Sequence, residues 1–148
     1  MEVKFNMKIS TKGRYAIRVM IDLAEHMSDE YTPLKDIAKR QDISEKYLES
    51  IIKLLVKSNL LVGVRGKGGG YKLTREPEKY TILEILQNTE DSLVPVACLE
   101  TEPNKCKRAS ECKTLKMWED VNKLIQDYFR NITIGDLASI NFNDDYII

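Results

Sequence analysis

The sequence predicts a mainly α protein with one small β-hairpin. Three observations carry this prediction. Apolar residues recur at helical spacing in several segments, two short runs of β-forming residues flank a glycine-rich turn, and a final amphipathic segment indicates one long helix. Apolar residues make up 43% of the 148-residue chain and charged residues 31%, which is typical of a globular domain.

Two helices are predicted near the N-terminus. In residues 15–27 the apolar positions follow the i, i+3, i+4, i+7 pattern of one buried face, and they are Ile17, Met20, Ile21 and Ala24. Thr32 followed by Pro33 indicates a helix start, with the threonine as N-cap and the proline at the first helical position. We therefore expect a second, short helix over residues 33–40.

A third helix is expected after a tight connection at residues 41–43. Ser44 is the predicted N-cap, and the apolar positions behind it recur at helical spacing, at Leu48, Ile51, Ile52 and Leu55. A short helix and a longer one joined by a three- to four-residue turn are typical of a helix-turn-helix. Generic helical hairpins share this pattern, so both alternatives are open at this point of the chain.

The stretch VRGKGGGYKL, residues 64–73, predicts a β-hairpin. Residues 60–64 and 71–73 are short runs of β-forming residues, and the turn between them holds four of the seven glycines. A nucleotide-binding loop needs Lys-Ser/Thr and then a helix, whereas here Lys67 precedes Gly68 and a strand follows. A hairpin directly after a helix-turn-helix is a wing, and its glycines permit positive φ and a close approach of the backbone to a duplex.

A fourth helix and a long loop are expected beyond the hairpin. Thr81 and Glu84 form a predicted capping box, which opens a helix whose inward positions are Ile82, Ile85 and Leu86. From about residue 89 the periodicity ends, and a loop of some twenty residues with two prolines follows. Loops of this length inside compact domains are usually functional.

A long helix is predicted at residues 114–131. Its apolar residues are spaced alternately by three and four, the pattern of a helix-pairing seam, and they are Trp118, Val121, Ile125, Tyr128 and Ile132. Such a seam suits packing on a helix of a partner subunit or, alternatively, on the chain's own winged domain. Thr133 is the expected N-cap of a closing helix that ends near Ile140.

Charge is unevenly distributed although the chain is neutral overall. Residues 1–79 carry 16 Lys and Arg against 11 Asp and Glu, whereas residues 80–148 carry 7 against 12. A basic half is suited to contact with phosphates while the acidic half faces elsewhere. No apolar run approaches a membrane span, and the first residues lack the apolar core of a secretory signal, so we expect a cytoplasmic protein without a membrane partner.

All three cysteines, Cys98, Cys106 and Cys112, lie in the long loop or at its edge. Structural zinc commonly uses four ligands with a Cys-x2–4-Cys pair, which this spacing lacks, and the single histidine, His26, is far along the chain. Iron–sulfur clusters take thiolates at varied spacings and accept one non-cysteine ligand. Cluster or metal binding and thiol redox sensing are both open. No constellation of acid, base and nucleophile indicates an enzyme.

Three segments together resemble the Rrf-two family of bacterial transcription regulators: MKISTKGRYAIRVMIDLA (7–24), DISEKYLESIIKLLVKSNLL (42–61) and VRGKGGGYKL. The resemblance extends to NITIGDLA (131–138). It implies a homodimeric winged-helix repressor or activator that binds double-stranded DNA, with the long helix crossing between subunits. The implied regions are a winged helix-turn-helix DNA-binding domain at 1–88, a cysteine-bearing sensor loop at 89–113, and a dimerisation helix with a short closing helix at 114–148.

The DNA-reading positions follow from the resemblance. In IscR-like members a Glu of the recognition helix and an Arg of the wing read DNA, and the matching residues are Glu49 and Arg65. A Glu accepts from the amino group of cytosine, and an Arg enters the negative minor groove. Further expected contacts lie at the start of the recognition helix and in the wing, at Ser44, Lys46, Tyr47, Lys67 and Gly68.

The three cysteines match the cluster-binding triplet of IscR-like and NsrR-like members, which CymR-like members generally lack. The resemblance implies an iron–sulfur cluster, [2Fe–2S] in the IscR-like case, that modulates DNA binding. The fourth ligand is not identified, because Leu115 replaces a His of IscR-like members and Arg14 an Asp of NsrR-like members. Nearby candidates are Glu100, Glu102 and Glu111. The alternative is a CymR-like regulator of cysteine and sulfur metabolism, cluster-free and controlled by thiols or a partner.

Overall fold

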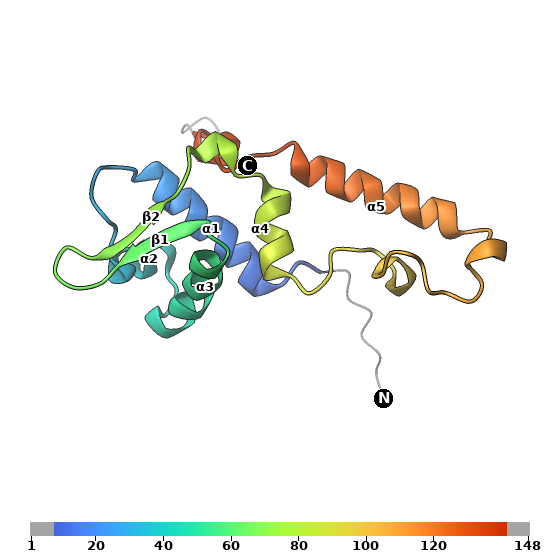
Figure 1. Cartoon of the computed structure of the whole chain (residues 1–148). Coiled ribbons are helices and arrows are strands. Elements are labelled where there is room, and N and C mark those ends of the chain that lie inside the picture. Colours follow the sequence, from blue (N-terminus) through green and yellow to red (C-terminus); the bar gives the residue numbers. More distant parts are fainter. Residues whose placement is uncertain (1–7, 142–148) are drawn as a thin grey trace.

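A computed structural model describes residues 8–141, a helical body with one two-stranded hairpin and a long projecting helix (Figure 1). The C-terminal NDDYII and Met7 lie outside the described residues. The fold class predicted from the sequence is confirmed. The elements are α1 (Thr11–Glu25), α2 (Leu34–Gln41), α3 (Glu45–Lys57), β1 (Leu61–Val64), β2 (Gly70–Leu73), α4 (Ile82–Thr89), α5 (Leu115–Arg130) and α6 (Ile134–Ala138).

Helix α1 lies at the centre of the body and packs against α2, α3, α4 and α6. It begins earlier than predicted because the Ser10 hydroxyl accepts a hydrogen bond from Gly13 N at 3.0 Å and caps the helix. The predicted buried face is correct only at Met20. The fully buried apolar positions are Ala16, Val19, Met20 and Leu23, while Ile17, Ile21 and Ala24 are half-buried at the edge of the core.

The helix-turn-helix consists of α2 and α3. Ser44 caps α3 as predicted, since its side chain accepts from Tyr47 N. The predicted cap of α2 is wrong: Pro33 stands at the N-cap position without a side-chain hydrogen bond, and Thr32 instead pairs with Tyr71 of β2. Between the helices, Asp42 adopts the left-handed conformation with a φ of 53°, which turns the chain sharply into α3.

The wing is an antiparallel hairpin in which β1 pairs with β2 from Leu61 opposite Leu73 to Val64 opposite Gly70. The segment before α2 pairs with β2 through an isolated β-bridge, because Thr32 and Tyr71 exchange two backbone hydrogen bonds of 3.0 and 2.9 Å. Gly70 permits this approach: its φ is +151°, and a Cβ there would lie under 3.0 Å from backbone atoms of Thr32. The wing is therefore fixed to the entrance of the helix-turn-helix.

Buried polar groups join the wing to the rest of the body. The Tyr80 ring is fully buried, and its hydroxyl donates to Leu60 O at 2.8 Å and accepts from Thr74 N at 2.7 Å.

The predicted capping box of α4 is half formed. Thr81 accepts from the backbone of Glu84 at 3.1 Å, but the Glu84 carboxylate binds Arg75 with two hydrogen bonds of 2.7 Å instead.

A reciprocal capping box closes the chain at α6. Thr133 accepts from Asp136 N at 3.0 Å, and the Asp136 carboxylate accepts from Thr133 N at 2.9 Å. The cap at Thr133 is therefore confirmed, although α6 ends at Ala138, before the predicted Ile140. Backbone hydrogen bonds between the start of α4 and the segment before α6 hold α6 against the body.

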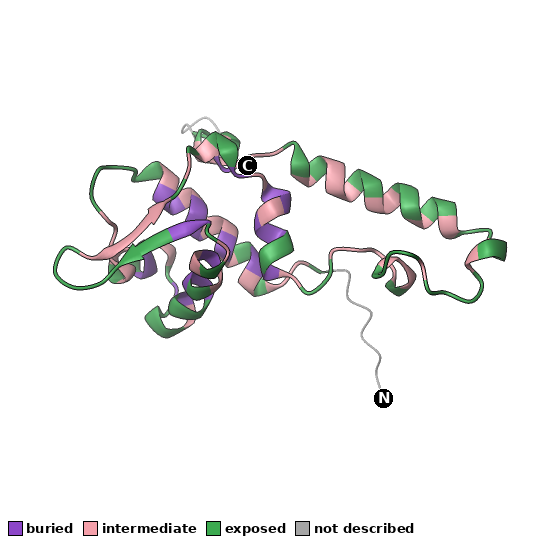
Figure 2. Ribbon diagram, in the orientation of Figure 1, coloured by how far each residue is buried: buried purple, intermediate pink, exposed green. Residues whose placement is uncertain are grey.

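The hydrophobic core fills the body and excludes α5. Its buried apolar side chains come from α1–α4, the start of β1, α6 and three connecting residues, Ile43, Leu60 and Tyr80 (Figure 2). No residue of α5 is buried, and this helix packs on the body mainly through α4 and through Phe129 near its C-terminal end. The cysteine loop, predicted from residue 89 to 113, begins after Thr89, the last residue of α4. It runs beside α5 and carries two short 3₁₀ turns at Ala97–Leu99 and Ala109–Glu111.

Candidate nucleic-acid interface and cysteine loop

One face of α3 is buried and the opposite face is exposed and polar. Leu48, Ile51, Ile52 and Leu55 pack into the core, as the helical spacing predicts. The exposed side chains on the other face are Ser44, Glu45, Lys46, Glu49, Ser50, Lys53 and Lys57. A helix with a polar exposed face of this width, following a short helix and a tight turn, has the form of a recognition helix.

Helix α1 holds the helix-turn-helix through three side chains on one face, Tyr15, Arg18 and Asp22. The Tyr15 ring meets the Tyr47 ring of α3 edge-on, with centroids 5.8 Å apart. Arg18 stacks over Tyr15 at 4.8 Å and donates to the side chain of Gln41 at 3.2 Å, at the end of α2. Tyr47 is therefore half-buried by α1, which leaves only part of its side chain available to a ligand.

Asp22 is the buried anchor of the same arrangement. Its carboxylate is 1% exposed and accepts from Arg40 at 2.7 and 3.0 Å and from the Gln41 side chain at 2.8 Å. The hydrogen bonds that Arg40 donates to Asp22 raise the pKa of the Arg40 guanidinium above its ordinary value. A buried carboxylate needs such partners, so the pair fixes the end of α2 and, with it, the direction in which α3 leaves the turn.

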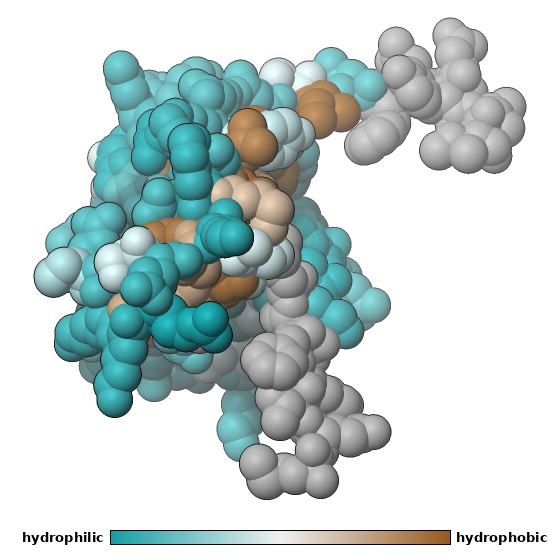
Figure 3. Space-filling model, turned by 90° about the vertical axis from the view of Figure 1, so that its right-hand side faces the viewer, coloured by the Kyte–Doolittle hydropathy of each residue, from teal (hydrophilic) through white to brown (hydrophobic). Residues whose placement is uncertain are grey.

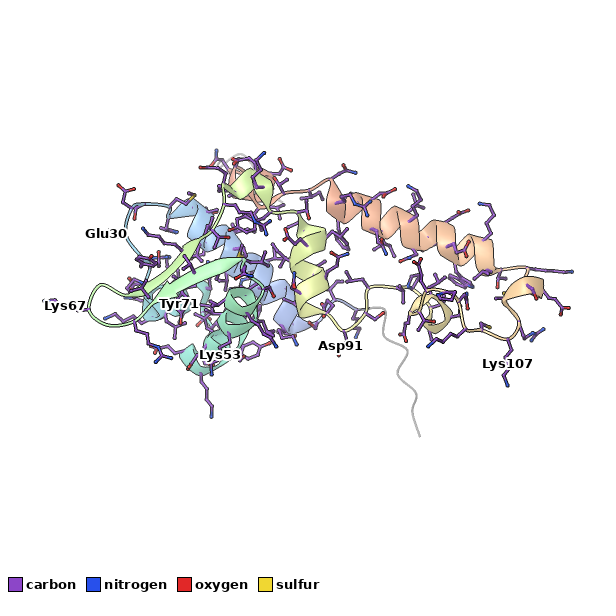
Figure 4. The ribbon with its side chains drawn as sticks, viewed as in Figure 1. Glu30, Lys53, Lys67, Tyr71, Asp91 and Lys107 are labelled. Atoms are coloured by element: carbon purple, nitrogen blue, oxygen red, sulfur yellow. The ribbon has the colours of Figure 1, made fainter. Side chains whose placement is uncertain are left out.

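The wing tip is exposed and basic, and two of its glycines have open space around them. Arg65 and Lys67 are both exposed, and Lys67 projects from the tip of the hairpin (Figure 4). Gly66 and Gly68 have φ values of +92° and +77°, with nothing within 4 Å of the place where a Cβ would lie. The predicted positive φ in the turn is confirmed, and a strand rather than a helix follows it.

A groove of about 430 Å³ separates α3 from the wing. It brings together Glu49 and Arg65, which lie far apart in the sequence. Its charged rim also includes Lys53 and Lys57, which the sequence reasoning did not single out. Their spacing of four and eight residues from Glu49 was a usable signal, because such positions share one face of a helix. The remaining lining is Ile52, Val56, Gly63, Val64 and Tyr71.

The three cysteines are free thiols at separate points of the cysteine loop. Cys106 is exposed, whereas Cys98 and Cys112 are half-buried. Within residues 8–141 no three His, Cys, Asp or Glu side chains are grouped closely enough to hold a metal ion, so neither the thiols nor the candidate glutamates form a finished site. The donor chemistry nevertheless suits a cluster, since three thiols share one segment.

The environment of Cys112 favours its thiolate. A hydrogen bond with the Thr114 hydroxyl, 3.4 Å from the sulfur, lowers the pKa of the Cys112 thiol, and the charge of Arg108 acts in the same direction. Thiolates rather than thiols bind metals and attack oxidants. Cys112 is thus chemically suited both to ligation and to redox chemistry.

Helix α5 has one apolar side that is only partly covered by the described residues. Its members are Leu115, Met117, Trp118, Val121, Leu124, Ile125, Tyr128 and Phe129, and all are exposed or half-buried. The side chains of Leu124 and Tyr128 are 70% and 66% exposed. The opposite side carries the ion pairs Lys116–Asp120 and Lys123–Asp127.

The alternative that the seam packs on the chain's own winged domain holds only at the end of α5, where Phe129 reaches the core. Seen from the end that carries the cysteine loop, apolar side chains gather in the middle of the face and hydrophilic ones surround them (Figure 3). An apolar surface rimmed by polar residues is typical of a protein interface. Across residues 8–141, no helix has the length and apolar character needed to cross a bilayer.

Comparisons with known proteins agree with this geometry. The Rrf2 (Rrf-two) family model, described as an iron-dependent transcriptional regulator, matches residues 9–140. The HTH-type transcriptional regulator IscR of Vibrio parahaemolyticus is 36% identical over 135 residues, 91% of this chain and 79% of the relative. The structure of CymR, the global cysteine regulator of B. subtilis, matches with a TM-score of 0.74 and 34% identity, covering 91% of this chain and 98% of CymR.

A second solved structure, IscR of T. potens, has a TM-score of 0.71 and 36% identity, covering 95% of this chain and 96% of that protein. The structural matches therefore include both an IscR and a CymR, and both extend over nearly the whole chain. The recognition helix and the wing agree with what these relatives indicate. The chain belongs to the Rrf2 family of iron-dependent transcriptional regulators, which are DNA-binding regulators and not enzymes.

Proposed function

We propose that the chain is a homodimeric, sequence-specific regulator in the cytoplasm whose DNA preference is modulated by an iron–sulfur cluster held by Cys98, Cys106 and Cys112. One observation carries the proposal: the exposed polar face of α3 and the basic wing share a groove. The cysteine loop lies at the far end of the molecule, as the positions of Lys67 and Lys107 illustrate (Figure 4). Residues 1–88 then bind DNA, 89–113 sense, and 114–148 dimerise.

In the proposed complex α3 enters the major groove and the wing lies on the adjacent minor groove. Glu49 accepts from a cytosine amino group, and Arg65 enters the minor groove. These roles are supported by exposure, since both side chains line the groove between α3 and the wing. Ser44, Lys46 and Tyr47 at the start of α3 contact phosphates or bases. At the wing tip, Lys67 contacts a phosphate and Gly68 lies against the duplex.

The partner that we propose for α5 is a second copy of this chain. Among the described residues, a single chain buries none of the eight apolar residues of α5 and leaves Met117, Leu124 and Tyr128 exposed. Helices with seams of this spacing pair with one another. Pairing through α5 would also place two recognition helices in one molecule, as the reading of two half-sites requires.

The proposed cluster is [2Fe–2S], with three thiolates of this chain and a fourth ligand that is not assigned. When bound, it would supply iron–thiolate bonds that tie three separate points of the cysteine loop to one centre. That loop joins the end of α4 to the start of α5, so ordering it biases the angle between the body and the dimerisation helix. A coupling of this kind is typically worth about 1–3 kcal/mol.

A cluster-free thiol regulator is the second candidate, and the accessibility of its thiols favours it. Cys106 is exposed, and the Thr114 hydroxyl lowers the pKa of the Cys112 thiol. One structural relative is named as a cysteine regulator. This candidate predicts colourless protein even without oxygen, and loss of free thiols after mild peroxide.

The test is selection of bound duplexes from a random pool by oxygen-free protein and by its Cys106→Ala variant. We expect both to bind DNA, but to select different sequence classes, because only the parent protein holds a complete cluster. Identical sequences bound with equal affinity would contradict cluster control and leave DNA reading in place. Failure of both proteins to enrich any sequence would contradict DNA reading itself.

A further inference from the structure

We propose that Lys53 determines sequence specificity: by pairing with Glu49, it lets α3 bind sites that offer Glu49 no cytosine amino group. The inference rests on the proposed DNA-reading function and deepens it. It concerns how strictly the protein selects its sites, not whether it binds DNA.

Lys53 lies one helical turn after Glu49 on the exposed face of α3. Its Nζ atom is 3.8 Å from Glu49 Oε1, and the side chains are 77% and 54% exposed. Both line the groove between α3 and the wing, and Lys53 points away from the body (Figure 4). The pair therefore stands on the surface that a duplex would cover.

A carboxylate on a DNA-reading surface discriminates by repulsion as well as by attraction. Opposite a cytosine, Glu49 accepts a hydrogen bond from the amino group. Opposite another base, it loses water without gaining a donor and faces the negative field of the phosphates, which rejects that site. A cation held beside the carboxylate supplies a substitute partner, so its benefit is larger at the sites without cytosine.

The strength of the pair changes between the free and the bound protein. In water an exposed Glu–Lys pair at i,i+4 contributes little. Covered by a duplex, the two charges lose solvent, and their interaction strengthens as the local dielectric falls. The effect of Lys53 is therefore expected in the comparison of DNA sites rather than in protein stability.

Lys57 provides a matched control on the same helix. It lines the same groove and is also exposed. It lies two turns from Glu49, and its ammonium group forms no ion pair with that residue among the described contacts. Replacing Lys57 removes one positive charge from the DNA-facing surface without disturbing the Glu49 pair.

The experiment uses the full chain and a duplex selected by the parent protein, together with copies in which each C·G pair is changed to T·A. Fluorescence anisotropy gives the dissociation constants for the parent, Lys53→Met and Lys57→Met proteins. The discrimination ratio is the dissociation constant for a substituted duplex divided by that for the selected duplex. We expect Lys53→Met to raise this ratio by about five-fold at the one base pair that faces Glu49, because the bound pair is desolvated. Lys57→Met should leave that ratio within about two-fold, because it removes only a phosphate-attracting charge.

Both lysine variants should weaken binding overall and lower the salt slope by about one. In a Glu49→Gln background, Lys53→Met should no longer change the ratio. Equal ratios for the two lysine variants, or an effect that persists without the Glu49 charge, would make Lys53 an ordinary phosphate contact and overturn the inference. A parent protein that selects no sequence would instead overturn the proposed function, and the inference with it.

Discussion

Gly70 fixes the wing to the helix-turn-helix, and the Gly70→Ala variant tests that description. Its φ is +151°, and an added Cβ would lie under 3.0 Å from the carbonyl group of Thr32 and from the nitrogen of Pro33. These are backbone atoms, so no side-chain rotation relieves the overlap. The two segments must separate, which breaks the backbone hydrogen bonds of 3.0 and 2.9 Å between Thr32 and Tyr71.

The size of the effect follows from these contacts. Each backbone hydrogen bond contributes about 1 kcal/mol net, and an alanine held at positive φ costs about 1–2 kcal/mol. Gly70→Ala should therefore lower the free energy of unfolding by about 3–4 kcal/mol. Gly66→Ala is the matched control: its φ is +92° and nothing lies within 4 Å of its Cβ position, so only the conformational cost of about 1–2 kcal/mol applies.

Urea unfolding followed by far-ultraviolet circular dichroism measures both variants at one protein concentration. We expect the midpoint to fall for both and to fall clearly further for Gly70→Ala. Equal losses for the two variants would refute the reasoning, because they would mean that the wing gains nothing from its attachment at Thr32.

Three further predictions concern buried charge, DNA contacts and dimerisation. Asp22→Ala should lower the free energy of unfolding by about 2–4 kcal/mol in the same assay, since it removes a buried carboxylate and leaves the partly exposed Arg40 without its partner. An unchanged midpoint would contradict the anchor role. Arg65→Ala should weaken specific DNA binding by about 1–3 kcal/mol. Lys67→Ala should weaken binding to all DNA sequences alike and lower the salt dependence of binding by about one in slope. An unchanged slope would mean that Lys67 contacts no phosphate. Leu124→Asn should shift sedimentation toward monomer while Lys123→Gln does not, and equal behaviour would contradict pairing through α5.

Local signals in the sequence were sufficient where the structure is local. Ser44 caps α3 as predicted because an N-cap needs only the amide of Tyr47 three residues on. The glycine-rich turn was likewise predictable, since positive φ at Gly66 and Gly68 is a property of the turn itself. Helical spacing predicted α3 and α5 correctly for the same reason.

Local sequence patterns gave wrong predictions where a segment distant in the sequence determines the contacts of a residue. Thr32 has the sequence of a helix cap, but its backbone pairs with Tyr71, which lies far along the chain. Glu84 was expected to complete a capping box, and Arg75 binds its carboxylate instead. The buried face of α1 was predicted wrongly because the helix is apolar on adjacent faces, and only tertiary packing selects between them.

The candidate site was predictable in part. The sequence indicated Glu49 and Arg65, and the fold places both on one groove. The spacing of Lys53 from Glu49 indicated a shared helix face, but the groove that both residues line forms only when the wing packs beside α3. The cysteine spacing indicated a sensor loop, yet the three thiols lie at separate points of that loop, and spacing alone does not bring them together.

The central claim is that this regulator carries an iron–sulfur cluster on its three cysteines. The most direct test is the visible absorption, iron content and acid-labile sulfide of protein purified without oxygen, beside the Cys106→Ala variant. We predict brown parent protein containing iron and sulfide, and a bleached variant that keeps its helical circular dichroism. Colourless, iron-free parent protein would contradict the claim and favour the thiol-based regulator.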